Sequence, residues 1–283
     1  MAAIAPQIQY RQEWIKGFEQ RQAIARMTAT TEVMLKGNQA TFLVADSGSA
    51  TAVTRGINGL IPARNDSLTQ VTATLTEWHD LVQKTSFNIF ESQSDQRAIM
   101  QDTSLATINR KLDSEIITEL NTGTQDTGTT ATASLAMALR AKTILGNAKV
   151  PFDGNIYALI TPAFESFLLQ VKEFASHDYV PIAPMKDANT AWRDSPMMYR
   201  WVGVNWIVHP SLPGAATSAE KCFMYHKSAI GHAFNTGDLD AKIGYDEEQD
   251  YSWARTTIFS SAKLLQNTGI VVMNHDGSSL AAE

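Results

Sequence analysis

The sequence feature that most restricts the fold is a long helical pattern between residues 94 and 120. Apolar residues recur there every three or four positions on one stripe, and charged residues lie mostly off it; the stripe contains Leu105, Ile108, Leu112, Ile116 and Leu120. A rise of 1.5 Å per residue makes such a helix about 40 Å long. The pattern predicts one continuous helix over 94–120.

The segment before this helix, residues 54–92, is rich in Thr and Val and has patches of period two, as at Val71, Ala73 and Leu75. Pro62 and the polar residues 64–67 interrupt it. The segment therefore predicts a long β-hairpin with its tip near 62–68. A hairpin of two strands is marginal on its own and must lie on another surface, for which a second copy of the chain is the natural candidate.

The other elements follow from local patterns. Helical spacing predicts an amphipathic helix over 11–35, and an Ala-rich helix near 131–145 follows a Thr/Gly-rich loop. After an apolar strand at 156–161, Thr161 and Pro162 supply the N-cap and first position of a helix that runs to Phe174. The remaining prediction is an acidic turn at 238–250 and strands at 200–209, 221–225, 229–234, 251–265 and 269–274.

Length and charge limit the function classes. A chain of 283 residues forms one large domain or two smaller ones, and 44% hydrophobic with 18% charged residues is typical of a globular protein. The 29 acidic residues exceed the 23 basic ones, and the net charge is -6. This balance argues against a general basic surface for nucleic acid, because such binding depends on neutralising phosphates.

One cysteine, Cys222, allows neither an intramolecular disulfide nor a thiolate metal cluster within the chain, and it is expected to act as a small core residue. The apolar runs are too short to cross a bilayer, and residues 1–10 lack the features of a secretory signal. A reducing cytoplasm and no membrane are the expected setting.

Two triplets resemble those of aspartic proteases, one beginning at Asp46 and one at Asp126. Two such carboxylates brought together could share a proton and perform acid/base chemistry. However, Asp126 follows polar residues instead of a buried strand, and a strong helix lies between the two triplets. An aspartic-protease-like hydrolase that uses Asp46 and Asp126 is thus kept as the alternative to a non-enzymatic protein, with small-residue turns as the simpler interpretation.

Other chemical motifs fail on single positions. Thr129 stands where a phosphate-binding loop at 123–130 needs its lysine, and Lys242 and Gln249 stand where an EF-hand starting at Asp238 needs ligands. The six histidines are dispersed without metal-ligand spacing and are expected at the surface or at strand ends. The sequence predicts no catalytic residues, no cofactor and no metal.

The order of these elements resembles the major capsid protein of tailed bacteriophages, which has an α+β architecture called the Johnson fold. The resemblance covers nearly the whole chain and includes local patterns: the strand, Thr-Pro turn and helix that begin at residue 155, the apolar strand at 201–208 with a Leu-Pro exit at 212–213, and the long strands that end at 269–273.

The resemblance implies an N-arm at 1–53, an extended hairpin called the E-loop at 54–90, a P-domain with a spine helix at 91–147, an α/β A-domain at 148–236, and a return to the P-domain sheet at 237–283. The tip of the E-loop implies contacts between subunits; we expect them at Pro62, Arg64, Asn65 and Asp66. Some relatives form a covalent cross-link through an E-loop lysine, but this tip has Arg64 and no lysine, so we do not expect that reaction.

The implied function is structural: many copies assemble into hexamers and pentamers of an icosahedral head that encloses double-stranded DNA. Scaffolding and portal proteins are the implied partners, with decoration proteins as further candidates. No N-terminal scaffolding extension is evident, so we expect a separate scaffolding protein. The implied location is the virion, with the host cytoplasm during assembly. An acidic chain suits a container that holds DNA without sequence-specific contact.

Overall fold

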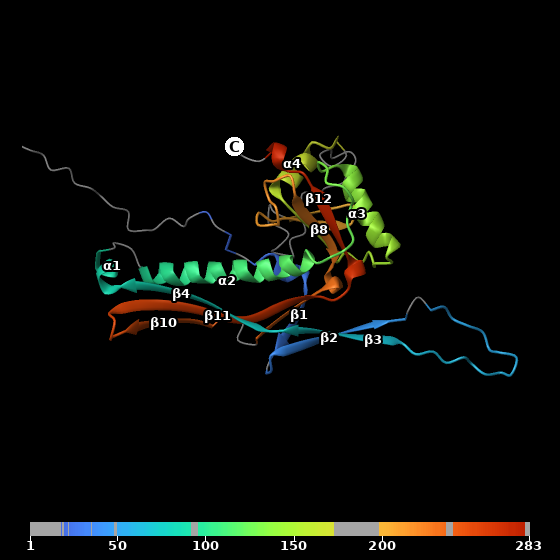
Figure 1. Cartoon of the computed structure of the whole chain (residues 1–283), viewed down its shortest axis with the longest axis horizontal. Coiled ribbons are helices and arrows are strands. Elements are labelled where there is room, and N and C mark those ends of the chain that lie inside the picture. Colours follow the sequence, from blue (N-terminus) through green and yellow to red (C-terminus); the bar gives the residue numbers. More distant parts are fainter. Residues whose placement is uncertain are drawn as a thin grey trace, which may run out of the picture.

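The computed structural model of the chain describes residue 18 and residues 20–21, 23–34, 36–47, 50–91, 96–172, 198–235 and 240–280. Its longest helix, α2 (Gln96–Leu120), confirms the helix predicted from the apolar stripe, although residues 94 and 95 lie outside the described part. Helix α2 lies along one face of a five-stranded sheet, as Figure 1 shows.

The sheet beside α2 is built around one long strand. Four strands are hydrogen-bonded in the order β1-β9-β11-β10, and the fifth strand, β4, also pairs with β11. The strands are β1 (Thr30–Met34), β4 (Thr76–Thr85), β9 (Ile230–Asn235), β10 (Asp240–Asp246) and β11 (Tyr251–Leu264). Ile258 of β11 is fully buried against Ile108 and Leu112 of the helix. Ser104 and Thr256 join the two elements by a hydroxyl–hydroxyl hydrogen bond of 2.9 Å. The apolar stripe of α2 therefore finds its partner in the same chain.

The hairpin differs from its prediction in its strands. The paired strands are β2 (Gln39–Asp46) and β3 (Ser67–Thr74), antiparallel from Gln39↔Thr74 to Asp46↔Ser67. Strand β4, predicted as part of the hairpin, pairs with β11 instead, and the short helix α1 (Ser86–Glu91) follows it. The prediction of a hairpin within 54–92 is therefore wrong, because period two identifies a strand but not the strand with which it pairs.

The helix predicted over 11–35 is wrong for the described residues. Residues 25–28 form one 3₁₀ turn, and β1 follows, paired in parallel with β9. Residues 11–17 lie outside the described part. The β-branched residues of β1 favour a strand, and the free edge of β9 supplies the partner that helical spacing could not reveal.

A second five-stranded sheet has the order β12-β8-β5-β7-β6, and helices α3 and α4 accompany it; the strands are β5 (Ile156–Ile160), β6 (Met198–Trp201), β7 (Val204–Val208), β8 (Glu220–His226) and β12 (Ile270–His275). Helix α3 (Leu135–Asn147) packs against β12 and β8, and its N-cap is Ser134. Helix α4 (Pro162–Leu169) begins as predicted, because the Thr161 hydroxyl accepts a hydrogen bond from the Phe164 amide and Pro162 needs no partner.

Three predicted details change in this region. Strand β12 lies beside β8, so the prediction that 237–283 returns as a whole to the sheet along α2 is wrong for this strand. The strand predicted at 200–209 is divided into β6 and β7 by a turn at Val202 and Gly203, both with positive φ. The acidic segment contains the strand β10 as well as a turn, while residues 238 and 239 lie outside the described part.

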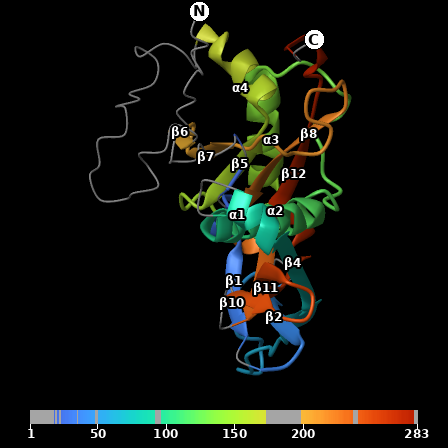
Figure 2. The same cartoon turned by 90° about the vertical axis from the view of Figure 1, so that its left-hand side faces the viewer.

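The two sheets meet at α2. Ile108 and Leu112 pack on the first sheet, whereas Ile116, Ile117 and Leu120 belong to the large core of the second. Figure 2 shows α2 between the two layers of strands, and Figure 1 shows the hairpin β2–β3 extending away from both. The architecture thus leaves the outer part of this hairpin without cover from the rest of the described chain.

Candidate functional site

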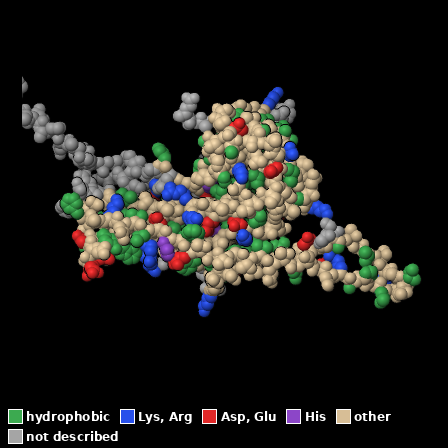
Figure 3. Space-filling view, viewed as in Figure 1, with side chains coloured by type: hydrophobic (Ala, Val, Ile, Leu, Met, Phe, Trp, Pro, Cys, Tyr) green, Lys and Arg blue, Asp and Glu red, His purple; other side chains and the backbone are tan. Residues whose placement is uncertain are grey.

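The hairpin β2–β3 exposes large apolar side chains to solvent. Six of them are between 61% and 107% exposed: Leu43, Val53, Ile57, Leu60, Ile61 and Leu68. Figure 3 shows apolar side chains gathered at this end of the molecule. An apolar cluster of this kind, at the end of an extended element, is typical of an interaction surface.

The base of the hairpin is anchored to the first sheet. Phe42 is 8% exposed and packs in a small core with Ala40, Ala73 and Ala233. Its ring lies so close to Gly231 of β9 that a Cβ atom there would come within 2.8 Å of it. The Leu75 amide also donates a hydrogen bond of 2.8 Å to the Asn38 carbonyl. The hairpin is therefore held at its base, whereas the described residues of its tip, 47 and 50–66, are exposed.

The predicted contact residues all lie in this tip. Pro62, Arg64, Asn65 and Asp66 are exposed. The Arg64 guanidinium lies 3.0 Å from the Asp66 carboxylate and donates a hydrogen bond of 3.2 Å to the Ser47 carbonyl. These local contacts shape the loop and leave its outer side available.

The two aspartates of the alternative hypothesis are not brought together. Asp46 is exposed at the end of β2, on the hairpin. Asp126 is exposed in the loop after α2, where it bridges to Val272 of the second sheet and its carboxylate accepts a hydrogen bond from the Gly128 amide. The second triplet is a turn closed by a hydrogen bond to its own aspartate. Because Asp46 and Asp126 lie on different parts of the fold, their carboxylates cannot share a proton.

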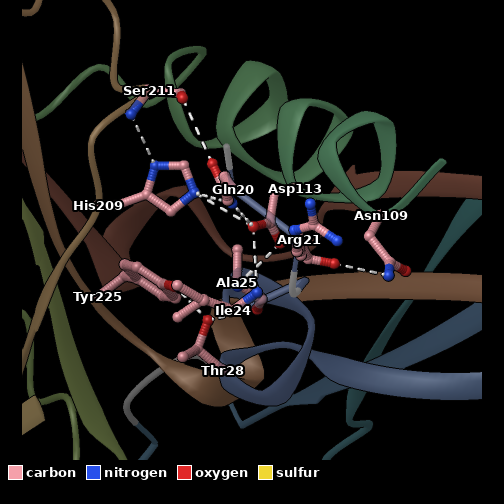
Figure 4. A network of polar contacts seen from close by, with 10 residues as sticks. All are labelled: Gln20, Arg21, Ile24, Ala25, Thr28, Asn109, Asp113, His209, Ser211 and Tyr225. Carbon is pink, nitrogen blue, oxygen red and sulfur yellow. Dashed lines mark hydrogen bonds and ion pairs between the residues drawn. The ribbon is translucent and has the colours of Figure 1, made fainter. Parts of the chain in front are cut away.

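A buried polar network lies where α2, the segment before β1 and the end of β7 meet (Figure 4). The Asp113 carboxylate of α2 accepts hydrogen bonds from the amides of Ile24 (3.0 Å) and Ala25 (2.9 Å) and from the Gln20 side chain (2.6 Å). His209 Nε2 lies 3.1 Å from the same carboxylate, and His209 Nδ1 accepts from the Ser211 amide at 3.2 Å. The Gln20 side-chain nitrogen also lies 3.0 Å from His209 Nε2, so Asp113, His209 and Gln20 contact one another.

A second buried histidine lies at the end of β12. His275 is fully buried between the rings of Phe164 and Phe167, and its Nε2 is 3.5 Å from the carboxylate of Glu220. Burial lowers the pKa of His275, and this effect exceeds the opposite influence of the Ala131 carbonyl, Glu220 and Asp276. The geometry is that of a packed core group.

The other candidate groups are structural. Cys222 is buried as predicted, and burial raises the pKa of its thiol to about 12, so it is unreactive. His209 and His226 follow or end strands as predicted, but they are buried, and His232 lies buried within β9; His177 lies outside the described part. Within the described ranges, no three His, Cys, Asp or Glu side chains form a group that could hold a metal ion, and no described helix is long and apolar enough to cross a membrane.

Sequence reasoning missed the Asp113 network, while the contact role expected of the four tip residues stays a prediction. Asp113 and His209 are 96 positions apart and share no motif. The available signal was Asp113 itself, a charged residue beside the apolar stripe of the long helix.

Comparison of the sequence with known proteins identifies a matching protein family. A sequence model described as phage capsid protein matches residues 2–276. No curated protein matches the sequence significantly.

Solved structures share the fold over nearly the whole chain. A structure from Mycobacterium phage Che8 has 16% sequence identity and a TM-score of 0.72, covering 95% of this chain and 97% of that one. The capsid of Ralstonia phage GP4 has 9% identity and a TM-score of 0.68, with 98% and 96% covered. The capsid of a native GTA particle has 13% identity and a TM-score of 0.67, with 97% and 96% covered. Since the sequence match spans nearly the full length and the fold agrees, the chain belongs to the phage capsid protein family, a family of structural proteins of the virion.

Proposed function

We propose that copies of this chain assemble into hexamers and pentamers of an icosahedral phage head that encloses double-stranded DNA. In this proposal the chain has the Johnson fold, with the hairpin β2–β3 as the E-loop, α2 as the spine helix of the P-domain, and the second sheet with α3 and α4 as the A-domain. The observation that carries the proposal is the exposed apolar hairpin on a chain of the capsid family.

The energetics of the hairpin support a covered state. Each Val, Leu or Ile side chain moved from water into a packed interface contributes about 1.5–3 kcal/mol. Four such side chains, Val53, Ile57, Leu60 and Ile61, are in the tip, and Leu43 and Leu68 flank it. A copy that covers them gains several kilocalories per mole at each contact, and symmetry repeats that contact around a ring. Pro62, Arg64, Asn65 and Asp66 follow the apolar tip residues in the chain and are our proposed contact residues, of which the last three supply polar side chains.

The partners and location follow from the same proposal. Scaffolding and portal proteins assist assembly in the host cytoplasm, and decoration proteins are further candidates. The net charge of -6 limits attraction between the shell and the packaged DNA, which makes no sequence-specific contact with it.

The experiment compares particle formation by the wild type and by a variant in which Val53, Ile57, Leu60 and Ile61 are replaced by Ser. The matched control replaces four polar or small tip residues by Ser, namely Ala50, Thr51, Thr54 and Asn58, and keeps the loop length. Analytical ultracentrifugation and negative-stain microscopy measure the products, and circular dichroism reports folding.

We expect closed particles from the wild type and the control, and soluble subunits or small oligomers with native circular dichroism from the apolar-to-Ser variant. Particles of normal size and yield from that variant would contradict the proposed role of the hairpin.

A further inference from the structure

Three segments of the chain converge on one carboxylate. The Asp113 side chain is 2% exposed, and His209, whose side chain is 1% exposed, contacts it from the end of β7. The segment before β1 supplies three donors, from Gln20, Ile24 and Ala25. Figure 4 shows these groups pointing toward the same oxygen atoms from different elements. A charge buried this completely is stable only while its partners remain in place.

Residues 20, 21 and 23–34 form a strap, a name used here for these residues, from Asp113 to the edge of the first sheet. Asn109 of α2 donates to the Arg21 carbonyl at 2.8 Å, and the Thr28 hydroxyl bonds to the hydroxyl of Tyr225. The Thr30 hydroxyl donates to the Lys227 carbonyl at 3.0 Å, and β1 then pairs along β9. Strand β1 ends at Met34 and β2 begins at Gln39, so the strap ends at the base of the hairpin.

Solvent can reach the carboxylate end of the strap. A cavity of about 210 Å³ adjoins the network and is lined by Gln20, Arg110, Asp113, Ser114 and His209 among others. Water entering this space can replace the donors of the strap on Asp113, and Gln20, Ile24 and Ala25 can be solvated in turn. The strap can therefore also exist in an undocked state in which water solvates Asp113 and the strap donors. A contact sealed by apolar residues would lack such a state.

We infer that Asp113 is a latch for the strap: by holding Gln20, Ile24 and Ala25 on α2 it sets the direction in which the hairpin projects, and assembly requires that direction. The inference rests on the proposed function, because the proposed function gives the hairpin its role in assembly. Asp113 is a positioning residue, and it acts on the contact between subunits through the strap and the anchored hairpin base.

The first test measures the strap in the unassembled subunit, independently of particle formation. Asp113→Asn keeps the shape of the side chain and replaces one acceptor oxygen by an NH₂ group that faces N–H donors. Gln20→Glu acts from the strap side and places a second carboxylate against Asp113. Gln266→Glu, at an exposed position, makes the same charge change away from the latch.

Hydrogen–deuterium exchange at pH 8 reports the amides of Ile24 and Ala25. We expect at least tenfold faster exchange in Asp113→Asn and Gln20→Glu than in the wild type and Gln266→Glu, with unchanged exchange in α3. Wild-type exchange rates in both latch variants would overturn the inference.

The second test measures the direction of the hairpin. Spin labels on Cys residues introduced at Ile57 and Leu139, both exposed, give a distance distribution by pulsed electron resonance, while Cys222 is buried and stays unlabelled. We expect a broader distribution in Asp113→Asn and at least a tenfold loss of particles. A distribution as narrow as in the wild type, or normal particle yield from subunits with an open strap, would overturn the inference. If the wild type itself forms no particles, the proposed function fails, whereas exchange and distance still decide whether Asp113 holds the strap.

Discussion

Val202 adopts a backbone conformation that disfavours its side chain. Its φ is 53°, followed by Gly203 at 77°, so the two residues form the tight turn between β6 and β7 with positive φ at both positions. A β-branched residue in the left-handed region is strained by about 1–2 kcal/mol. The Lys142 ammonium donates a hydrogen bond of 2.7 Å to the Val202 carbonyl and helps to hold the turn.

Replacing Val202 by Asn should stabilise the subunit. Asn-Gly is the favoured pair for a turn with positive φ at both central residues, and the carbonyl that Lys142 binds is retained. We expect a gain of about 1 kcal/mol, which corresponds to a rise in Tm of about 2–4 °C. Differential scanning calorimetry of the unassembled subunit measures it, with the buried Val204→Asn as a destabilising control. An unchanged or lower Tm for Val202→Asn would contradict the assigned strain.

His275 makes the stability of the subunit depend on pH. Burial holds its pKa below the ordinary value of 6.5, whereas the unfolded chain has the ordinary value. As the pH falls through 6.5, the unfolded state takes up this proton before the folded state does. The free energy of unfolding should therefore decrease between pH 7.5 and pH 5.5.

Urea unfolding at both pH values checks this sign. His275→Asn should be less stable at pH 7.5, because it loses contacts with Phe164 and Phe167, but its free energy of unfolding should change less between the two pH values. Equal pH dependence in His275→Asn and the wild type would remove His275 as the cause.

At the scale of elements, one close contact sets where the hairpin leaves the sheet. The Phe42 ring occupies the space that a side chain at residue 231 would need, and a Cβ atom there would lie 2.8–3.0 Å from three ring atoms. Only glycine allows β2 to approach β9 in this way. The strap and this contact together connect the hairpin to the body.

Gly231→Ala should destabilise the subunit by about 1–3 kcal/mol through this clash. Phe42→Leu should by itself lower stability by about 1–2 kcal/mol because it removes buried apolar atoms. In the double variant the smaller side chain makes room for the new methyl group, so the two losses should not add and a coupling of at least about 1 kcal/mol is expected.

Chemical denaturation of the four proteins in the cycle measures the coupling. Gly56→Ala, where the nearest atom to a new Cβ is 3.7 Å away, serves as the control and should change stability by less than about 0.5 kcal/mol. Additive losses in the double variant would show that Phe42 does not restrict residue 231.

At the scale of the whole molecule, the chain is an elongated body with a hairpin that projects from one end (Figure 1). If the tip docks on a different surface of the next copy, the contact is head-to-tail, and such contacts close into rings when the rotation between copies allows it. Substitutions in the tip should therefore reduce assembly without changing the stability of the subunit, because side chains there contribute little to the isolated fold.

Arg64→Ala tests this expectation. Its ion pair with Asp66 is exposed, with side chains 52% and 61% accessible, and such pairs contribute about 0–1 kcal/mol. We expect the Tm of the subunit to stay within about 2 °C, while the yield of closed particles falls severalfold. Sedimentation of assembly reactions measures the yield, and Arg140→Ala, exposed on α3, is the control. Equal particle yields from both variants would exclude Arg64 from the contact.

The sequence alone determined the elements whose signals are local. The stripe of α2 repeats within one helix, Thr161 and Pro162 specify the start of α4 by capping, and apolar runs identify β5, β8 and β12. The exposed tip could also be found, because Pro62 and the polar residues after it interrupt the strand pattern. Each of these signals arises from residues that contact one another along the same stretch of chain.

Only the tertiary structure decided which strands pair and which side chains meet. Period two is the same whether β4 pairs with β3 or with β11, and residues 30–34 form a strand instead of a helix because the edge of β9 is available. The network at Asp113 joins distant groups, for example Gln20 and His209, which are 189 positions apart. Pairing and burial are set by the packing of the whole chain, and the pattern within a segment carries no information about the segment that will lie beside it.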